Sequence, residues 1–309
     1  MEQFYYSIEE SAVDQRVDRF LFDKLTNISR SQIQRLIDEN HLLVNGKKVK
    51  ASYRLRLEDE VAFELSEKEE LKVGAQDLPL DIIYEDEDLA VINKPVGMVV
   101  HPAPGNETGT LVNALLFHFK DLSSVNGEIR RGIVHRIDKD TSGILVVAKN
   151  DRAHEALSLQ LQDHSMKREY VALCEGIIKE DEGTINAPIA RDPRHRLRMG
   201  IVRGGREAIS HFKVQHRYEE TTLVRVRLET GRTHQIRVHM ASIHHPVVSD
   251  PVYGYKKQKI EYSGQLLHAR VLGFNHPKDG KYMEFSCPVP EEFRFILEKL
   301  AKRKEGLER

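Results

Sequence analysis

The spacing of apolar residues divides this chain of 309 residues into a short helical part and a longer part rich in strands. Near the start, apolar residues recur as on one face of a helix, at Val17, Phe20, Leu21 and Leu25. The same spacing predicts a second helix at Ile33, Leu36 and Ile37. Ser29, followed by Gln32 three residues later, predicts a capping box at its start. The segment 41–49 predicts a β-hairpin, because Asn45 and Gly46 favour a tight turn.

Beyond residue 77 the period shortens and β-branched residues become frequent, which is typical of strands. The pattern predicts strands at 82–84, 89–92, 144–148, 168–173 and 223–227. It predicts helices at 110–119, at 151–161 with Asp151 as N-cap, and around 293–300. We also predict a strand around 235–239, which places Gln235, Arg237 and His239 on one face.

Composition limits the class of protein. With 40% hydrophobic and 31% charged residues the chain is typical of a soluble globular protein, and its length suggests one large and one small domain. No apolar run approaches the roughly 20 residues of a membrane span, and the first residues do not resemble a secretory signal. Cys174 and Cys287 are expected as buried thiols of a reducing, cytoplasmic compartment, with a disulfide as the alternative.

The charge distribution indicates where RNA or DNA could bind. The formal net charge is -1, so such binding must rest on local patches. Residues 30–56 hold seven Lys or Arg and two acids, and could face a phosphate backbone or only solvent. The segment 191–206, with six Arg, presents the same alternatives as a basic loop. Residues 58–70 hold seven acids and one Lys, which marks the end of the small domain and a hydrated linker.

One stretch concentrates candidate chemistry. The segment 135–143, HRIDKDTSG, places a His, an Arg and two Asp directly before the buried strand 144–148. Loops that enter a rigid strand often hold functional side chains. Local chemistry alone favours an ordinary polar turn, because such clusters are common before strands.

Four motifs together resemble the RluA/RluD family of RNA pseudouridine synthases. They are KPVG at 94–97, HRIDKDTSG at 135–143, REY at 168–170, and the long stretch at 228–254 that contains TGRTHQIRVHM. In addition, SRSQIQRLI at 29–37 and VNGK at 44–47 resemble an S4-type RNA-binding domain. The resemblance covers essentially the whole chain. The chain departs from the family pattern at two positions, His244, where the family usually has Gly, and Ser249, where it often has Gly. These changes bear on substrate choice.

The resemblance implies an α+β fold, in which a catalytic domain with a mixed, mostly antiparallel sheet follows a small S4-type α/β domain. We expect the S4-type domain at 14–64, the linker at 65–76 and the catalytic domain at 77–309. The expected activity is isomerisation of uridine to pseudouridine in large-subunit rRNA by a monomer, with no cofactor and no metal. The implied catalytic residues are Asp138, Tyr170 and Arg237.

Further residues are assigned by the same resemblance. Arg136 is expected to take the place of the target base in its stack, since the target must leave the RNA helix. The expected RNA contacts of the small domain are Arg30, Arg35, Lys47 and Lys48. The expected supports of the cleft are Lys94, His135, Thr141 and Ile236.

Several alternatives stay open at this point. Asp140 is the second candidate for the catalytic carboxylate, which could act as a nucleophile or remove a sugar proton. A binding protein without activity is a rival hypothesis, although it has no need of a buried carboxylate. A metal-dependent hydrolase is another, because histidines occur at 234, 239, 244 and 245. The hydrolase hypothesis is disfavoured because His234 and His239 would lie on opposite faces of a strand.

Overall fold

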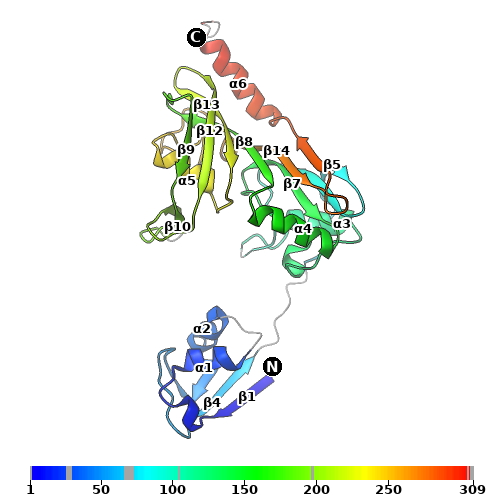
Figure 1. Ribbon diagram of the computed structural model, residues 1–309. Helices are drawn as coiled ribbons and strands as arrows, with labels where there is room; N and C mark the ends of the chain where they lie inside the picture. Colours follow the sequence, from blue (N-terminus) through cyan, green and yellow to red (C-terminus); the bar gives the residue numbers. More distant parts are fainter. Residues whose placement is uncertain are drawn as a thin grey trace. The chain divides into compact units, whose positions relative to one another are not determined.

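The computed structural model describes residues 2–25, 30–65, 73–103, 105–195, 198–304 and 306. The chain divides into two compact units, Met1–Leu71 and Lys72–Arg309 (Figure 1). Each unit has its own hydrophobic core. Within the described residues, no helix has both the length and the apolar character required to cross a bilayer.

The smaller unit is a four-stranded antiparallel sheet with two helices. The sheet has the order β1 (Glu2–Ser7), β4 (Glu60–Leu65), β2 (Leu42–Val44) and β3 (Lys47–Lys48). The helices are α1 (Val17–Lys24) and α2 (Arg30–Asp38), with a 3-10 turn at Glu10–Ala12. Buried residues of both helices pack with the sheet, at Val17, Phe20, Leu21, Ile33 and Ile37. The helical spacing read from the sequence is therefore confirmed in this unit.

Two details of this unit bear on the sequence predictions. Asn45 and Gly46 have φ of 50° and 70°, the left-handed pair that a tight hairpin turn requires, so the Asn-Gly turn is confirmed. Strand β1 pairs with β4 along its whole length, so the unit includes residues ahead of the range 14–64 expected from the sequence. The predicted capping box at Ser29 lies outside the described residues.

The larger unit is built on a nine-stranded mixed sheet. Its strands follow the order β5 (Asp81–Glu85), β6 (Leu89–Lys94), β7 (Ser142–Ala148), β14 (Leu267–Asn275), β8 (Lys167–Glu175), β13 (Thr221–Leu228), β12 (Ile209–Arg217) and β9 (Glu182–Asn186), and β15 (Tyr282–Ser286) pairs with β14. Among these pairs, β7 with β14 is parallel and the others are antiparallel. The expectation of a mixed, mostly antiparallel sheet is confirmed.

Helices cover the sheet at several points (Figure 1). They are α3 (Leu111–His118), α4 (Asp151–Gln162), α5 (Gln235–Ser242) and α6 (Glu291–Lys304), with a 3-10 turn at Glu128–Arg130. Helix α4 packs on β7 and β14, and α5 lies against β12. The predicted N-cap of α4 is wrong: the Asn150 side chain accepts the hydrogen bond from the Ala153 amide. Asp151 instead accepts a hydrogen bond from the Ser123 hydroxyl.

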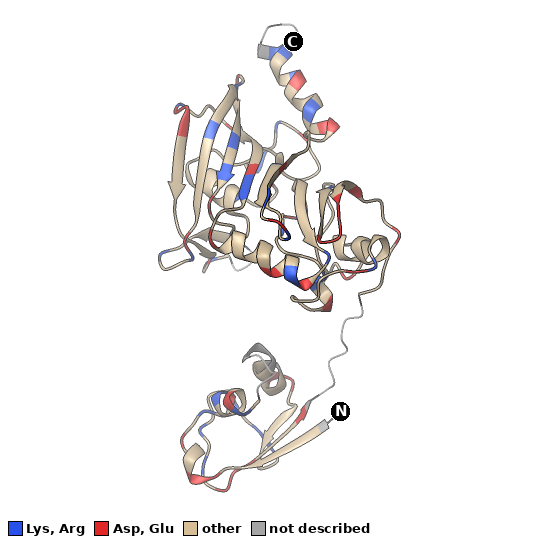
Figure 2. Ribbon diagram, turned by 45° about the vertical axis from the view of Figure 1, so that its right-hand side comes forward, with Lys and Arg blue, Asp and Glu red and all other residues tan. Residues whose placement is uncertain are grey.

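The basic segment 191–206 is more ordered than the predicted loop. Strand β10 (Ile189–Arg191) pairs with β11 (Met199–Ile201) in a short antiparallel hairpin at its start. Basic and acidic residues are interspersed over the larger unit (Figure 2). Cys174 and Cys287 are free and buried, so the prediction of buried thiols is confirmed.

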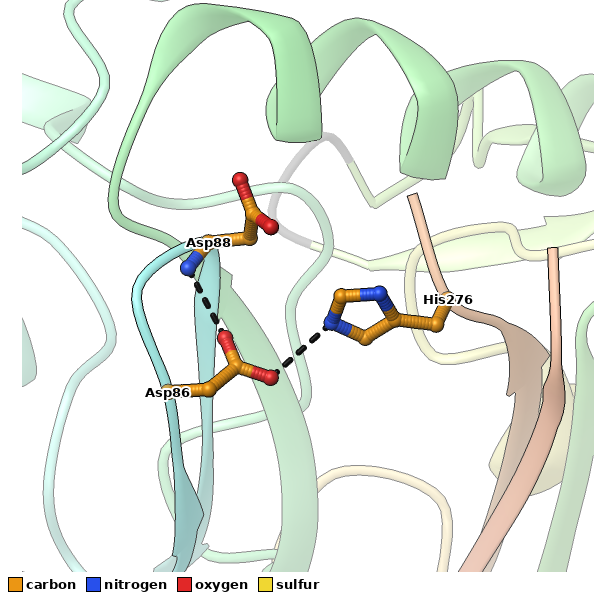
Figure 3. Close-up of side chains that lie close together, drawn as sticks. All are labelled: Asp86, Asp88 and His276. Carbon is orange, nitrogen blue, oxygen red and sulfur yellow. Dashed lines mark hydrogen bonds and ion pairs between the residues drawn. The ribbon is translucent and has the colours of Figure 1, made fainter. Parts of the chain in front are cut away.

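A polar tether joins two distant turns of the larger unit. The Asp86 carboxylate, in the β5–β6 turn, lies 2.9 Å from Nε2 of His276, in the segment after β14 (Figure 3). The other Asp86 oxygen accepts from the Asp88 amide at 2.8 Å, and the Asp88 carboxylate accepts from Asn150. Three possible metal ligands thus lie within 4.8 Å of one another. Each already has a partner in the fold, so the group acts as a tether.

Candidate active site

A pocket of about 570 Å³ opens where the loop before β7, strand β8 and the start of α5 meet. Seven of the candidate residues named from the sequence line it: His135, Arg136, Asp138, Thr141, Tyr170, Ile236 and Arg237. Among the described residues that line the pocket, Asp138 is the one carboxylate, whereas several are arginines. The pocket is therefore a basic cavity built around a single acid.

Lys94 stabilises the loop that carries Asp138. This side chain is fully buried, and its ammonium donates to the carbonyls of Pro95, Met98 and Lys139 at 2.6–2.9 Å. Burial lowers the pKa of Lys94 to about 7, although the Asp140 and Asp138 charges act in the opposite direction. Lys94 does not line the pocket itself but fixes the backbone next to Asp138.

Hydrogen bonds also fix the side chains of two other residues of the same loop, His135 and Thr141. The His135 ring accepts a hydrogen bond from the Val146 amide of β7 at 3.1 Å, and burial lowers its pKa to about 3, so the ring is neutral. Thr141 is buried, and its hydroxyl accepts from Gln265 at 2.8 Å. Asp140, the second candidate carboxylate, is not among the residues that line the pocket.

Strand β8 contributes two side chains to the pocket lining, one of them aromatic. Arg168 and Tyr170 are two positions apart, so they point to the same face of the sheet, and both line the pocket. Tyr170 is 8% exposed, and burial raises its pKa to about 12. The phenol therefore keeps its proton at neutral pH.

The segment that carries Arg237 is a helix, and the predicted strand at 235–239 is wrong. Gln235 and His239 are one helical turn apart and both contact Ser210 of β12. Arg237 is rotated by about 200° from Gln235, so it leaves the helix on the opposite side. The apolar and polar residues of this segment are nearly all buried, which removes the amphipathic signal that identifies a helix from sequence.

Arg237 connects two carboxylates. Its Nη1 donates to Oδ2 of Asp138 at 3.0 Å, while Nε and Nη2 donate to the two oxygens of Asp250 at 2.7 and 2.8 Å. The side chains of Arg237 and Asp250 are 5% and 0% exposed. Burial alone would raise the pKa of Asp250, but the Arg237 guanidinium and the backbone amides of Val252 and Tyr253 hold it below its ordinary value.

His234 lines this side of the pocket and contacts Tyr253 behind it. Tyr253 and Asp250 fall inside the motif at 228–254, but neither was assigned a role from the sequence. The His234 Nδ1 lies 2.9 Å from the Tyr253 hydroxyl, and its Nε2 lies 4.0 Å from Asp138. Tyr253 places its ring over the Arg237 guanidinium at 5.2 Å. Of the other histidines in this run, His239 uses both ring nitrogens on Ser210 and Ala187. His234 and His239 therefore contact different parts of the fold.

The remaining predicted RNA contacts belong to the other unit. Lys47 and Lys48 are exposed and form the edge strand β3. Arg30 and Arg35 begin and continue helix α2, but their side chains lie outside the described residues. Of the two departures from the family pattern, His244 is exposed and Ser249 is buried, and both have left-handed φ, of 66° and 60°.

Comparison with known families places the chain in one of them. The chain matches the RNA pseudouridylate synthase family over residues 88–242 and the S4 domain over residues 15–61. It belongs to the pseudouridine synthase family, whose members are isomerases, and the family expected from the sequence motifs is confirmed.

Individual relatives extend over nearly the whole chain. An uncharacterized RNA pseudouridine synthase of Bacillus subtilis, YlyB, is 50% identical over 98% of this chain and 99% of its own length. The ribosomal large subunit pseudouridine synthase D of Pseudomonas aeruginosa is 42% identical and covers 94% of each chain. Among solved structures, human RNA pseudouridylate synthase domain containing 1 has 26% identity and a TM-score of 0.57, over 73% of this chain and 87% of its own.

Proposed function

We propose that this protein isomerises specific uridines of large-subunit rRNA to pseudouridine, with Asp138 as the catalytic carboxylate. The observation that carries this proposal is the contact between Asp138 and Arg237 inside an otherwise basic pocket. Relatives that are 40–42% identical are named ribosomal large subunit pseudouridine synthase D, which supports the choice of RNA.

The reaction is an isomerisation, so no atom enters or leaves overall. The bond between N1 of uracil and C1′ of ribose breaks, the base turns, and C5 bonds to C1′. The proton on C5 is lost, and N1 ends protonated. Asp138 can attack C1′ or remove a proton from C2′, and both routes begin with an ionised carboxylate. Arg237 orients this carboxylate through a charge-assisted hydrogen bond.

The pocket admits one nucleotide rather than a duplex. A volume of about 570 Å³ is in the range of small-ligand sites, so the target base must leave its stack to reach Asp138. Tyr170 offers a protonated, largely buried ring on which uracil can stack. Arg136 is exposed and lines the pocket next to Asp138, where it can take the place of the departed base.

The deciding experiment maps pseudouridines in rRNA from a strain that lacks this protein. We expect the loss of one or a few large-subunit sites, restored by the wild-type gene and by Asp140→Asn but not by Asp138→Asn. Asp140 is the matched control because it lies two residues away and does not line the pocket. An unchanged rRNA map, or restoration by Asp138→Asn, rejects the proposal.

A further inference from the structure

Arg168 is a buried cation that has no carboxylate partner among the described residues. It is 7% exposed, and within those residues its guanidinium makes one hydrogen bond, from Nη2 to the carbonyl of Glu229 at 2.7 Å. Its Nε has no partner in the described part of the chain. A buried guanidinium has five donors, and leaving them unpaired costs free energy. The Nε itself is shielded from solvent, so a ligand in the pocket that Arg168 lines would pair with the terminal Nη groups.

The chain makes room for this side chain. Gly231 has no side chain, and a Cβ there would lie 2.6 Å from Nη1 of Arg168. The guanidinium is thus held between the Gly231 backbone on one side and the Glu229 carbonyl on another. The side chain is therefore fixed in the wall of the pocket, with its charge buried.

Two further arginines share this wall. Arg232 and Arg206 both line the pocket, and Arg232 donates through Nε to the Glu207 carbonyl at 2.8 Å. Burial is the main cause that lowers the pKa of Arg168, and the charge of Arg232 adds to it. The Arg206 charge acts on Arg232 in the same direction. Arg232 therefore repels both Arg168 and Arg206, and the Glu207 charge offsets this only in part at Arg232. Among the described residues, none of the three arginines forms an ion pair with a carboxylate.

We propose that Arg168, Arg232 and Arg206 form a binding site for a phosphodiester of the RNA next to the target nucleotide. A phosphate group carries the negative charge and the several acceptor oxygens that these donors lack, and arginine binds it through two parallel hydrogen bonds. A uracil carbonyl is neutral and could satisfy only part of the set. This inference rests on the proposed function for the identity of the polymer.

The test compares RNAs that differ in one charge. The full-length chain carrying Asp138→Asn, which prevents turnover, is mixed with a short single-stranded RNA containing one uridine. In two analogues, a neutral methylphosphonate replaces the phosphodiester on the 5′ or the 3′ side of that uridine. We expect one analogue to bind about tenfold weaker or worse, because it loses charge-assisted hydrogen bonds. Inorganic phosphate is added as a competitor, to separate binding of the polymer from binding of free phosphate.

The variants Arg168→Met and Arg232→Met should bind the unmodified RNA as weakly as the analogue and no longer distinguish the two. Gly231→Ala should do so partially, because its Cβ displaces the Arg168 guanidinium without removing it. Arg227→Met is the matched control, since Arg227 is exposed on the face of β13 opposite to the pocket residue Leu228. That control should keep the full discrimination.

Stability provides a readout that separates binding from a structural role. Removing an uncompensated buried charge should leave the melting temperature of Arg168→Met unchanged or raise it. A lower melting temperature together with intact discrimination shows a structural arginine and overturns the proposal. The proposal is also overturned if the protein without substitutions in the arginines binds the unmodified RNA and both analogues with equal affinity. It is overturned as well if free phosphate abolishes the binding of all three RNAs equally. Discrimination that persists when rRNA mapping shows no missing pseudouridine rejects the proposed rRNA function and leaves the phosphate site standing.

Discussion

The guanidinium of Arg237 and the carboxylate of Asp138 lie 3.0 Å apart, although 99 residues separate them in the chain. The contact depends on Asp250, which accepts hydrogen bonds from the other two nitrogens of the same guanidinium. A planar side chain bonded at two edges cannot rotate without breaking bonds at both. Asp250 therefore acts through Arg237 to orient the group that contacts Asp138.

Asp138→Asn tests whether the carboxylate performs the chemistry. The amide keeps the shape of the side chain but can neither attack C1′ nor take a proton, so we expect turnover to fall by about 10⁴-fold or more. The melting temperature should change little, because the Asp138 side chain is 18% exposed and Arg237 keeps both bonds to Asp250. Single-turnover assays with RNA and thermal unfolding measure the two effects. Asp140→Asn should retain activity, and its inactivation would move the assignment to the loop as a whole.

The S4-type unit is predicted to add affinity through phosphates. Lys47 and Lys48 are exposed on edge strand β3, where they can face an RNA backbone. Replacing both by Gln should weaken RNA binding and make its dependence on salt less steep. The logarithmic slope should fall by about 0.7 to 0.9 for each phosphate that is no longer neutralised. Titrations at several salt concentrations measure this slope, and a slope equal to that of the wild type means that the pair faces solvent in the complex.

Much of the fold could be predicted from the sequence, because hydrophobic period and turn chemistry are local properties. The Asn45-Gly46 hairpin turn and the buried strand that ends at Ala148 are examples. The α5 helix could not be predicted in this way, because six of its eight residues are buried and its apolar residues do not mark one face. The alternation of polar and apolar residues at 235–239 suggested a strand, but it arises because both kinds of residue are buried around this helix.

The site could be predicted only in part, because some of its residues act through contacts that form on folding. The sequence motifs pointed to Asp138, Tyr170 and Arg237, and these residues line one pocket. Asp250 lies within the motif at 228–254, but its role arises from a contact with Arg237 that only tertiary folding creates. Arg168 was visible in a motif, but its missing partner appears only when burial and hydrogen bonds are known.

His244→Gly is expected to stabilise the protein. His244 is exposed and has φ of 66°, a conformation that costs a residue with a Cβ about 1–2 kcal/mol. Glycine removes that strain but gains freedom in the unfolded chain, so the net increase in unfolding free energy should be about 0.5–1 kcal/mol. Chemical denaturation of both proteins measures this difference.

Ser249→Gly is the control for this prediction. Ser249 has nearly the same φ, of 60°, but it is buried and its hydroxyl donates to the Ile260 carbonyl. Glycine relieves the strain there and removes a buried hydrogen bond, so the gain should be cancelled or reversed. An equal gain at both positions would show that the hydrogen bond contributes nothing.

The last prediction concerns the buried pair of Arg237 and Asp250 and its dependence on pH. In the native protein the pKa of Asp250 is lowered, so the pair contributes stability above the unfolded value of about 3.9 and loses it as pH falls through the folded value. Arg237→Met removes the charge that lowers this pKa, and burial then raises it. A carboxylate with a raised pKa destabilises the fold at neutral pH, and the penalty fades in acid when the group becomes protonated. We expect a loss of about 3–5 kcal/mol at pH 7 that shrinks toward pH 4.

The double variant Arg237→Met with Asp250→Asn isolates the titrating group. Asn cannot ionise, so the deficit of the double variant should no longer depend on pH, and at pH 7 it should be smaller than that of Arg237→Met alone, because no buried charge is left unpaired. Thermal unfolding from pH 4 to pH 7 measures both trends. If the single variant shows the same deficit at every pH, Asp250 stays ionised without Arg237. Its remaining hydrogen bonds from the amides of Val252 and Tyr253 would then be sufficient to hold the charge in the core.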